Sequence, residues 1–518
     1  MNFKLRNLVA ATLAGSFLMG FGVNAMADST TDIVNALVAK GVLTEEEGAL
    51  LTKGRTEEAA GQAKALKKAS KLKVSDAIDN ATVYGDIRVR FEDRTNDAGT
   101  GVANAAISET KLGRARYKMT LGVKTEAGNW YSDLAMVMGA KGRSDNADFG
   151  SLASNEVDSK QALFLKRATV GFKATDWLAV EAGRMNNPLY TSSMVWDADL
   201  NVEGLVEKAT FKVGDADVFL TAVQSEYMGV RKLVGGVPSS GAQSTAFGVA
   251  PTSGAAMATA AGSAQLFAFQ AGLRKAFNDN TSAKAALTYS AYSKNPYSTN
   301  FGASVPNGGT ATTTYTTTGT SPGPYVTTAS TATTAGAANS SKGNLWGVND
   351  LNIIEIPAEV NYMAAGNVGV RLFEHFAINT SADDRARNSG IATAVNGSSG
   401  SDNIAWSLGL SVGSAKDLKA FEGNKMAKGD WNTKLWYQSV GIWSVDSALV
   451  DSDIFDGRVN MKGTTFKAQY NVEDNVALNF TAAHGDKKNT SYYAMGIGDL
   501  SGDLTKLNLM QFDVTYKF

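Results

Sequence analysis

The stretch VYGDIRVRFED at residues 83–93 alternates between apolar or small side chains and polar ones at every position. Successive side chains of a β-strand point to opposite faces, so a period of two predicts a strand with one apolar and one polar face. One face would carry Val83, Gly85, Ile87, Val89 and Phe91, and the other Tyr84, Asp86, Arg88, Arg90 and Glu92.

The same period continues along the chain. In residues 112–125, Ala115, Tyr117, Met119, Leu121 and Val123 oppose Arg114, Arg116, Lys118, Thr120 and Lys124. Sixteen segments can be proposed: 83–93, 112–125, 129–140, 162–174, 176–186, 203–213, 216–226, 264–276, 282–294, 350–363, 366–379, 402–413, 430–443, 458–472, 474–485 and 504–518. We therefore predict an all-β fold, a transmembrane up-and-down antiparallel β-barrel of about 16 strands with a short N-terminal helical segment.

The connections between these segments alternate in length. Residues 95–109, 142–161, 187–202 and 227–263 are long, whereas 126–128, Thr175, 214–215 and 278–281 are short, and only 414–429 breaks the order. Outer-membrane barrels combine tight periplasmic turns with long outer loops. Trp130, Trp177 and Trp431 follow short turns, as an interfacial aromatic girdle requires. The last strand alternates to Phe518, which resembles the assembly signal of bacterial outer-membrane proteins.

The N-terminus indicates export. Lys4 and Arg6 precede an apolar run at 8–23, and Ala25 and Ala27 form a small-residue cleavage site. We expect a signal peptide at 1–27, a periplasmic helical extension at 28–81 and an outer-membrane barrel at 82–518. The extension could contact the cell wall or remain a solvated helical hairpin.

The composition excludes several function classes. The chain has no cysteine, two histidines and a formal net charge of -1. These residues cannot build a zinc cluster, a thiol site or a broad nucleic-acid surface. His375 and His484 are the only candidates for a histidine-dependent hydrolase, and neither lies in a known nucleophile motif, so we expect neither an enzyme, a cofactor nor a metal.

Two positions conflict with a regular barrel. Pro357 falls inside the tenth segment, where it would remove a ladder hydrogen bond. Arg371 and Glu374 in the eleventh cannot both face the lumen without a bulge. We therefore expect either that the segment boundaries lie elsewhere at these positions or that the wall is irregular there.

Residues 163–204, LFLKRATVGFKATDWLAVEAGRMNNPLYTSSMVWDADLNVEG, resemble the bacterial putative-porin family, outer-membrane barrels related to the phosphate-selective porins. YGDIRVRFE at 84–92, GDWNTKLWYQ at 429–438 and DSDIFDG at 451–457 extend the resemblance over nearly all of 82–518. Val202 departs from the proline of the family's Asn-Pro-Glu-Gly. The resemblance implies a channel in the outer membrane of a Gram-negative cell, a homotrimer as one arrangement, and no cofactor.

A barrel of this size can hold an aqueous channel whose selectivity depends on its constriction. Parity predicts a basic wall facing inward: Arg88, Arg90, Arg114, Arg116, Lys118 and Arg167, with Lys124 and Lys173. Glu355 and Glu359 face inward on a later segment. The third long loop carries Asp197 and Asp199, with Glu203 at its end, and the resemblance implies that this loop folds into the lumen. We hypothesise a transverse field between wall and loop acids; a generic polar lining is the simpler interpretation.

The predicted function is passive diffusion of small hydrophilic solutes or ions through an outer-membrane porin in contact with lipid. A structural or adhesive surface barrel with a closed lumen is the main alternative, supported by the uncharged Thr-rich tract 295–341. A soluble exported β protein would leave its apolar faces exposed to water.

Overall fold

The computed structural model describes residues 78–98, 109–139, 144–150, 161–228, 264–293, 313–315, 329–331, 350–364, 368–388, 400–414, 427–490, 492, 494, 499–500 and 504–518. The chain divides into two units, residues 1–73 and 74–518, and the described residues all belong to the second. The expected signal peptide and all but the last four residues of the expected helical extension lie outside the described residues. So does most of the Thr-rich tract.

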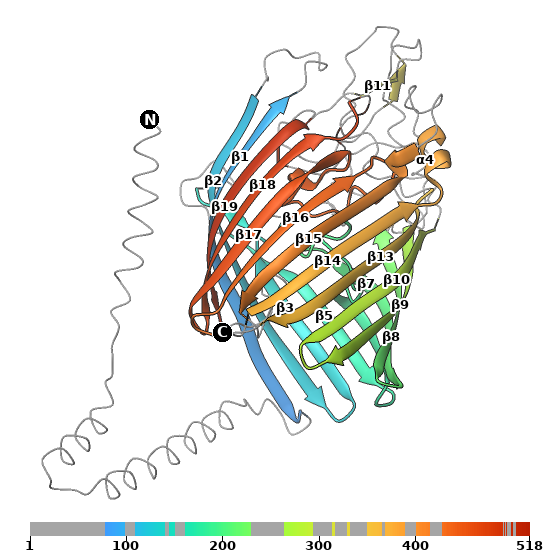
Figure 1. Cartoon of the computed structure of the whole chain (residues 1–518), viewed down its shortest axis with the longest axis vertical. Coiled ribbons are helices and arrows are strands. Elements are labelled where there is room, and N and C mark those ends of the chain that lie inside the picture. Colours follow the sequence, from blue (N-terminus) through green and yellow to red (C-terminus); the bar gives the residue numbers. More distant parts are fainter. Residues whose placement is uncertain are drawn as a thin grey trace, which may run out of the picture. The chain divides into compact units, whose positions relative to one another are not determined.

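The second unit is a closed antiparallel barrel (Figure 1). Its seventeen-stranded sheet consists of the two-residue β4 and sixteen longer strands. These are β1 (Asn80–Ala98), β2 (Glu109–Ala127), β3 (Trp130–Met138), β5 (Leu163–Lys173), β6 (Leu178–Asn186), β7 (Asn201–Val213), β8 (Ala216–Met228), β9 (Ala264–Asn278), β10 (Thr281–Tyr292), β13 (Asn352–Ala364), β14 (Val368–Asn379), β15 (Ile404–Ser414), β16 (Trp431–Val440), β17 (Met461–Glu473), β18 (Val476–Lys487) and β19 (Leu504–Lys517). Each pairs with the next, and β19 pairs with β1, which closes the ring.

The predicted fold class is confirmed, and each of the sixteen predicted segments overlaps one strand. β1 begins at Asn80, two residues before the predicted barrel boundary. Apolar side chains lie exposed on the outer face, as in Leu165, Phe269 and Leu287, which are 52%, 52% and 54% exposed. Charged side chains of the opposite parity are buried in the lumen. An outer face of this kind suits lipid, because it would be costly in water.

The barrel wall accommodates Pro357 and the pair Arg371 and Glu374 without interruption. The β10–β13 ladder has no pairs at Ile356 and Pro357, yet the register is the same on both sides, and the pairing with β14 continues. Arg371 faces the lumen and is 4% exposed. Glu374 is exposed on the outer face, and β14 has no register shift. The wall is therefore regular at β14, and only Arg371 lines the lumen.

An irregularity that parity did not predict occurs between β3 and β5. Ala135 pairs with Arg167 and Met136 with Leu165, so Lys166 is an extra residue in the ladder. A β-bulge of this kind lets two successive side chains point to the same side. Lys166 and Arg167 are accordingly both buried in the lumen.

Four glycines are covered by an aromatic ring from the residue directly opposite on the next strand. The pairs are Tyr84 with Gly122, Tyr131 with Gly171, Phe219 with Gly272 and Phe373 with Gly409. A side chain at Gly272 would place its Cβ 2.0 Å from the Phe219 ring. The glycines thus provide space for rings that lie flat on the inner wall, a device that stabilises curved sheets.

Short elements in the connections were not predicted from the sequence. They are β4 (Ala147–Asp148), the β11 (Thr313–Tyr315) and β12 (Ala329–Thr331) hairpin, α4 (Ala382–Asn388), and the 3₁₀ turns η3 (Gly400–Asn403) and η5 (Phe455–Gly457). Among the described residues, helices are too short or too polar to cross a membrane.

The ring-over-glycine pairs generate a stability prediction. Gly272→Val should displace the Phe219 ring and destabilise the barrel by about 1–3 kcal/mol, the usual cost of overpacking. The midpoint of unfolding, followed in urea by the mobility of unheated samples on gels, reports the change. Ala271→Val, which adds volume on the outer face, is the matched control. Equal midpoints for the two variants would show that the pair contributes nothing.

Candidate functional site

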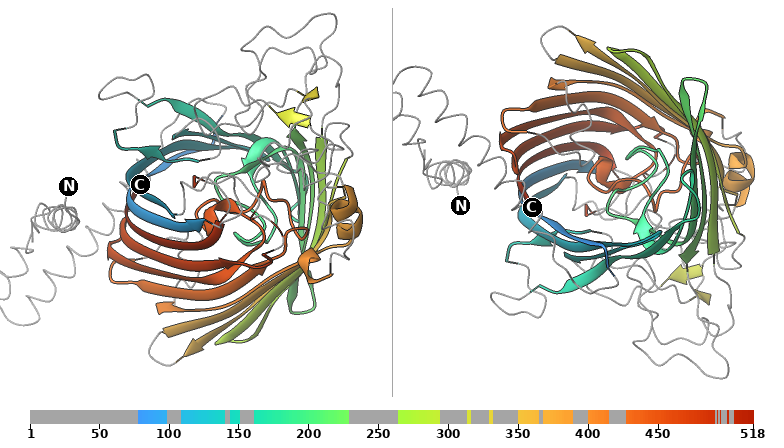
Figure 2. Two further views of the ribbon diagram at one scale, coloured as in Figure 1. Left: turned by 90° about the horizontal axis from the view of Figure 1, so that it is seen from above. Right: turned by 90° about the horizontal axis from the view of Figure 1, so that it is seen from below.

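Two connections enter the ring of strands (Figure 2). The first inner loop (residues 187–200) joins β6 to β7. Tyr190 donates to Glu359 at 2.9 Å, and Thr191 donates to Glu355 at 2.9 Å. Ser192 Oγ lies 2.6 Å from His375 Nδ1. The loop is therefore held against β13 and β14 by three consecutive side chains.

The second inner loop (residues 441–460) joins β16 to β17, and residues 441–450 are buried throughout. It docks on the first inner loop through backbone groups. Asp197 N donates to Leu449 O at 2.6 Å, and Asp451 N donates to Ser193 O at 3.1 Å. The Asp197 carboxylate also accepts from Ser452 N at 3.1 Å. The loops thus form one unit across the lumen.

Sequence reasoning did not predict that residues 441–460 fold inward. The apolar stretch VGIWSVDSALV at 440–450 was the available signal, because an exposed loop rarely carries so many apolar residues. Trp443 is 0% exposed and belongs to an apolar cluster with Ile442 and Val445. The same cluster includes Met194 and Val195 of the first inner loop and Ile353 of β13, so apolar packing joins the second inner loop to the first and to the wall.

The basic residues on β1 face the lumen and bind acids from other elements. Arg88 bonds Asn146 at 2.6 Å and lies 4.0 Å from Asp513. Arg90 binds both oxygens of Asp513, at 2.7 and 2.9 Å, and Asp453 at 2.7 Å. These pairs connect β1 to β19 and to the second inner loop.

Arg94 is the most enclosed of these cations. Its side chain is 1% exposed and contacts Glu92 at 3.1 Å, Asp453 at 3.3 Å and Asp456 at 3.1 Å. Sequence analysis missed Arg94 because the predicted strand ended at Asp93. Its inward parity with Arg88 and Arg90 would have identified it.

The basic residues of β2 and β5 are also paired. Arg114 bonds Glu92 at 2.6 Å and also pairs with Asp499. Arg116 bonds Asp148 at 2.8 Å. Lys118 lies 3.4 Å from Asp145, to which Lys166 also binds, and Arg167 bonds Asp133 at 2.9 Å. Lys124 and Lys173, nearer the short turns, lie 5.2 and 5.8 Å from the ring centroids of Tyr84 and Tyr131.

The charges in contact along this sector nearly balance. The wall contributes eight cations, Arg88, Arg90, Arg94, Arg114, Arg116, Lys118, Lys166 and Arg167, and Arg458 of the second inner loop also pairs with Asp456. Eight carboxylates lie within 4.0 Å of them: Glu92, Asp133, Asp145, Asp148, Asp453, Asp456, Asp499 and Asp513. Parity alone found mostly the cations, because four of the acids come from connections, one from the short β4, and two from β3 and β19.

The three acids expected at the constriction have different surroundings. Asp197 joins the two inner loops. Asp199 accepts from Asp145 N at 3.3 Å. Burial disfavours its charge, but Lys118, Lys166 and Arg88 outweigh burial and lower the pKa of Asp199. Glu203 lies on the outer face of β7 and pairs with Arg184, so its expected position in the constriction is wrong. Val202 and Val206 lie one and three residues from Glu203 on the same strand and point inward, so the alternation turns Glu203 outward.

The surroundings of Asp451 disfavour the ionised form of its side chain. Burial, with Asp197 and Asp453 nearby, raises the pKa of Asp451 to about 7, and Lys467 opposes the rise. Asp453 behaves in the opposite way. Burial would raise its pKa, but Arg90, Arg94 and Arg88 hold it well below the usual range.

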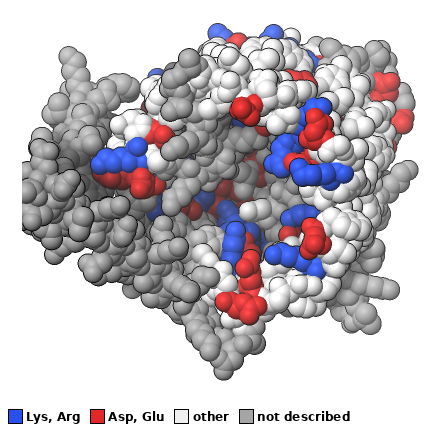
Figure 3. All heavy atoms as spheres, turned by 60° about the horizontal axis from the view of Figure 1, so that its bottom comes forward, with Lys and Arg blue, Asp and Glu red and all other residues white. Residues whose placement is uncertain are grey.

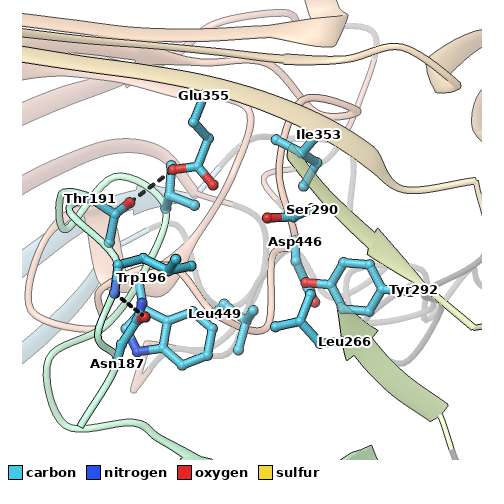
Figure 4. Close-up of a pocket in the computed structure, with 12 residues that line it drawn as sticks. Asn187, Thr191, Trp196, Leu266, Ser290, Tyr292, Ile353, Glu355, Asp446 and Leu449 are labelled. Atoms are coloured by element: carbon cyan, nitrogen blue, oxygen red, sulfur yellow. Dashed lines mark hydrogen bonds between the residues drawn. The ribbon is translucent and has the colours of Figure 1, made fainter. Parts of the chain in front are cut away.

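A small cavity lies between the inner loops and the wall (Figure 4). Its volume is about 20 Å³, room for about one water molecule. Glu355, Asp446, Ser290, Tyr292 and Asn187 supply its polar lining. It is too small to hold a solute and is consistent with one internal water.

His375 and His484 have different surroundings. His375, 2% exposed, lies between Ser192 and Glu355 Oε2, 3.2 Å away, and those same contacts fix the first inner loop. His484 lies on the outer side of β18 beside Asn508. In the part of the chain that the structure describes, acids and histidines form no group suited to hold a metal.

The opposite end of the lumen opens between the short turns. Figure 3 shows a hollow there, with basic and acidic side chains around and inside it. Lys434 lies 4.6 Å from the Phe373 ring centroid and 5.0 Å from that of Trp436, on the inner faces of β14 and β16. Charged side chains therefore line the lumen both at the inner loops and at the end near the short turns.

Comparison with known proteins gives a family and distant structures. The family model described as putative porin matches residues 92–518. The anion-selective porin from Comamonas acidovorans is 10% identical, with a TM-score of 0.40, over 85% of this chain and 99% of its own. A triple mutant of the Rhodopseudomonas blastica porin is 10% identical, with a TM-score of 0.35, over 85% and 100%. No curated protein matches the sequence.

The raised pKa of Asp451 predicts that docking of the inner loops depends on pH. The docked state holds this proton more tightly, so docking is strongest in acid and weakens as pH rises from about 4 to about 7. Above that range Asp451 is ionised in both states and the effect stops growing.

A spin label on Ala198→Cys, an exposed position of the first inner loop, would report docking through its mobility. We expect mobility to increase between pH 4 and pH 7. The same label in an Asp451→Asn background should show a smaller change. Identical pH profiles in both backgrounds would mean that Asp451 does not control docking.

Proposed function

The chain belongs to the putative-porin family, and from this premise we propose that it forms a water-filled channel for passive diffusion of small hydrophilic solutes or ions across the outer membrane. The observation that carries the proposal is the contrast between the two faces of the barrel wall. Exposed apolar side chains cover the outside, and charged side chains line the inside. A lumen of this polarity favours water and dissolved ions.

The two docked inner loops would form the constriction. They are held from opposite sides, by Glu355, Glu359 and His375 on β13–β14 and by Arg90 and Arg94 on β1. A constriction fixed by ion pairs and hydrogen bonds keeps its diameter, so a porin of this kind would conduct in steady steps.

Ion preference would be weak in the native channel. The basic wall that the sequence predicts is matched by acids at contact distance, so its field largely cancels.

The partners follow from this function. Outer-membrane lipid would contact the exposed apolar face, and an N-terminal signal peptide would direct export. A homotrimer and a cell-wall contact through residues 28–81 stay predictions from the sequence.

A closed surface barrel is the second candidate, because the buried second inner loop occupies lumen space. A plug would abolish conductance, whereas a constriction only reduces it. The two candidates therefore differ in one measurable property.

The decisive experiment is single-channel recording of the purified protein in planar bilayers, with the reversal potential measured under a salt gradient. We expect stable open steps and a reversal potential close to zero. Repeated insertion without conductance would support the closed barrel. A strongly anion-selective channel would contradict the charge balance while leaving the porin function intact.

Removing acids from the sector should expose its basic charge. Asp145→Asn combined with Asp453→Asn leaves Lys118, Lys166 and Arg90 with fewer partners, so the reversal potential should shift toward anion preference. Asp486→Asn, an acid on the outer side of β18, is the matched control and should leave the potential unchanged. Absence of a shift in the double variant would refute the role of these pairs in selectivity.

A further inference from the structure

A row of directly paired residues crosses the inner wall between His375 and the short turns. It consists of Arg371 on β14, Ser411 on β15, Lys434 on β16 and Lys467 on β17, and we call it the cationic row. Its two lysines face each other across the β16–β17 ladder. Like charges in this position destabilise a sheet, because the Cβ atoms of a direct pair lie only about 4.5–5.5 Å apart. An anion placed between the two lysines would remove this repulsion.

The strands around the cationic row carry their own acids elsewhere. Glu374 of β14 and Asp486 of β18 project outward, and Glu473 ends β17 at a short turn. Within β14–β18, whose strand residues are all described, no carboxylate therefore lies on the inner face beside the row. The sector of β1 to β5 is arranged differently, since each of its eight wall cations lies within 4.0 Å of a carboxylate.

Two acids from other elements reach the row. Glu359 of β13 binds Arg371 at 2.7 Å and also accepts from Tyr190. Asp451 of the second inner loop lies near enough to Lys467 for their charges to interact. Acids thus meet the row at its two ends, from β13 and from the second inner loop.

An apolar surface adjoins the lysine pair. Phe373 is partly exposed and lies flat on the wall over Gly409, with its ring centroid 4.6 Å from Lys434 Nζ. Trp436 is 5% exposed and packs against the second inner loop, with its ring centroid 5.0 and 5.7 Å from the Nζ atoms of Lys434 and Lys467. Cation–π attraction holds the two ammonium groups beside these rings. Lys434 and Lys467 are themselves partly exposed, so two ammonium groups and an apolar ring face the lumen together.

We propose that Lys434, Lys467 and Phe373 form a site in the lumen that binds small organic carboxylates. This inference rests on the proposed function, because the solute reaches the site through the water-filled lumen. The carboxylate lies between the two ammonium groups and accepts a charge-assisted hydrogen bond from each. Its hydrocarbon part lies against the Phe373 ring, as in ligand sites that combine an apolar lining with a few polar groups. An inorganic anion gains only the first contact, and a neutral hydrocarbon only the second.

Block of the open channel tests the proposal. Phenylacetate is the probe, and it is compared with acetate, which lacks the ring, with inorganic phosphate, and with benzyl alcohol, which lacks the charge. Each is added at equal ionic strength to single channels in potassium chloride. We expect phenylacetate to halve the mean current at a concentration about tenfold lower than acetate or phosphate, because only phenylacetate makes both contacts. Benzyl alcohol should not block at these concentrations.

Variants of the site separate the two contacts. Lys434→Gln combined with Lys467→Gln should raise the blocking concentration of phenylacetate about tenfold, because both hydrogen bonds to the carboxylate lose their charge. Phe373→Leu should raise it for phenylacetate and leave that of acetate unchanged. Lys208→Gln is the matched control, an inward lysine on β7 whose ammonium binds Glu181 at 2.8 Å, and it should leave the block as it is. Unheated gel mobility confirms that each variant folds.

Titration calorimetry of the detergent-solubilised full chain with phenylacetate measures binding whether or not the barrel conducts. Binding without conductance would support the site and contradict the channel. Steady conductance with neither block nor binding would overturn the site and leave the porin function intact. Phosphate that blocks at the same concentration as phenylacetate, or an unchanged block in the folded double lysine variant, would also overturn the proposal.

Discussion

A guanidinium removed from water is stable only where carboxylates surround it, and Arg94 imposes this constraint on the lumen. Its side chain is enclosed by Glu92 of its own strand and by Asp453 and Asp456 of the second inner loop. If the loop left the lumen, Arg94 would lose the carboxylates of Asp453 and Asp456 and keep Glu92 beside it. Breaking a buried ion pair costs about 3–5 kcal/mol, so the loop is held firmly.

The first inner loop depends on the second. Asp197 joins the two through its backbone N–H and its carboxylate, and Tyr190, Thr191 and Ser192 fix the far side to β13 and β14. The two docked loops therefore form a bridge between opposite walls. Asp451 lies in the middle of this bridge, where its charge is disfavoured, which makes docking sensitive to pH while the ends of the bridge stay fixed.

The barrel could be predicted from the sequence because the alternation of inward and outward side chains is visible within each strand. Arg88 and Arg116 could be placed in the lumen from alternation alone. Lys166 could not, because the bulge in β5 makes its side chain and that of the next residue, Arg167, point to the same side. Glu203 was misplaced because its position was inferred from the preceding loop rather than from β7 itself. The acids Asp453, Asp456 and Asp499 meet β1 and β2 only in three dimensions.

The same reasoning applies to the outside of the barrel. Most outward positions are apolar, so a polar residue there is informative, whereas polar residues in the lumen are expected of any water-filled barrel. Glu374, Glu203 and Arg184 stand out by this criterion, and the register between β6 and β7 places Arg184 directly opposite Glu203. The alternation in the sequence predicts on which face of the wall such a residue lies. The register between strands, which only the structure provides, shows which of these residues are neighbours.

We propose that ion pairs to β1 hold the inner loops inside a conducting lumen. Single-channel conductance of Arg90→Gln combined with Arg94→Gln tests it most directly, because both substitutions remove charges that bind Asp453. We predict larger and noisier conductance steps than in the native channel, as the second inner loop is released. Steps of native size and steadiness in a folded double variant would contradict the claim.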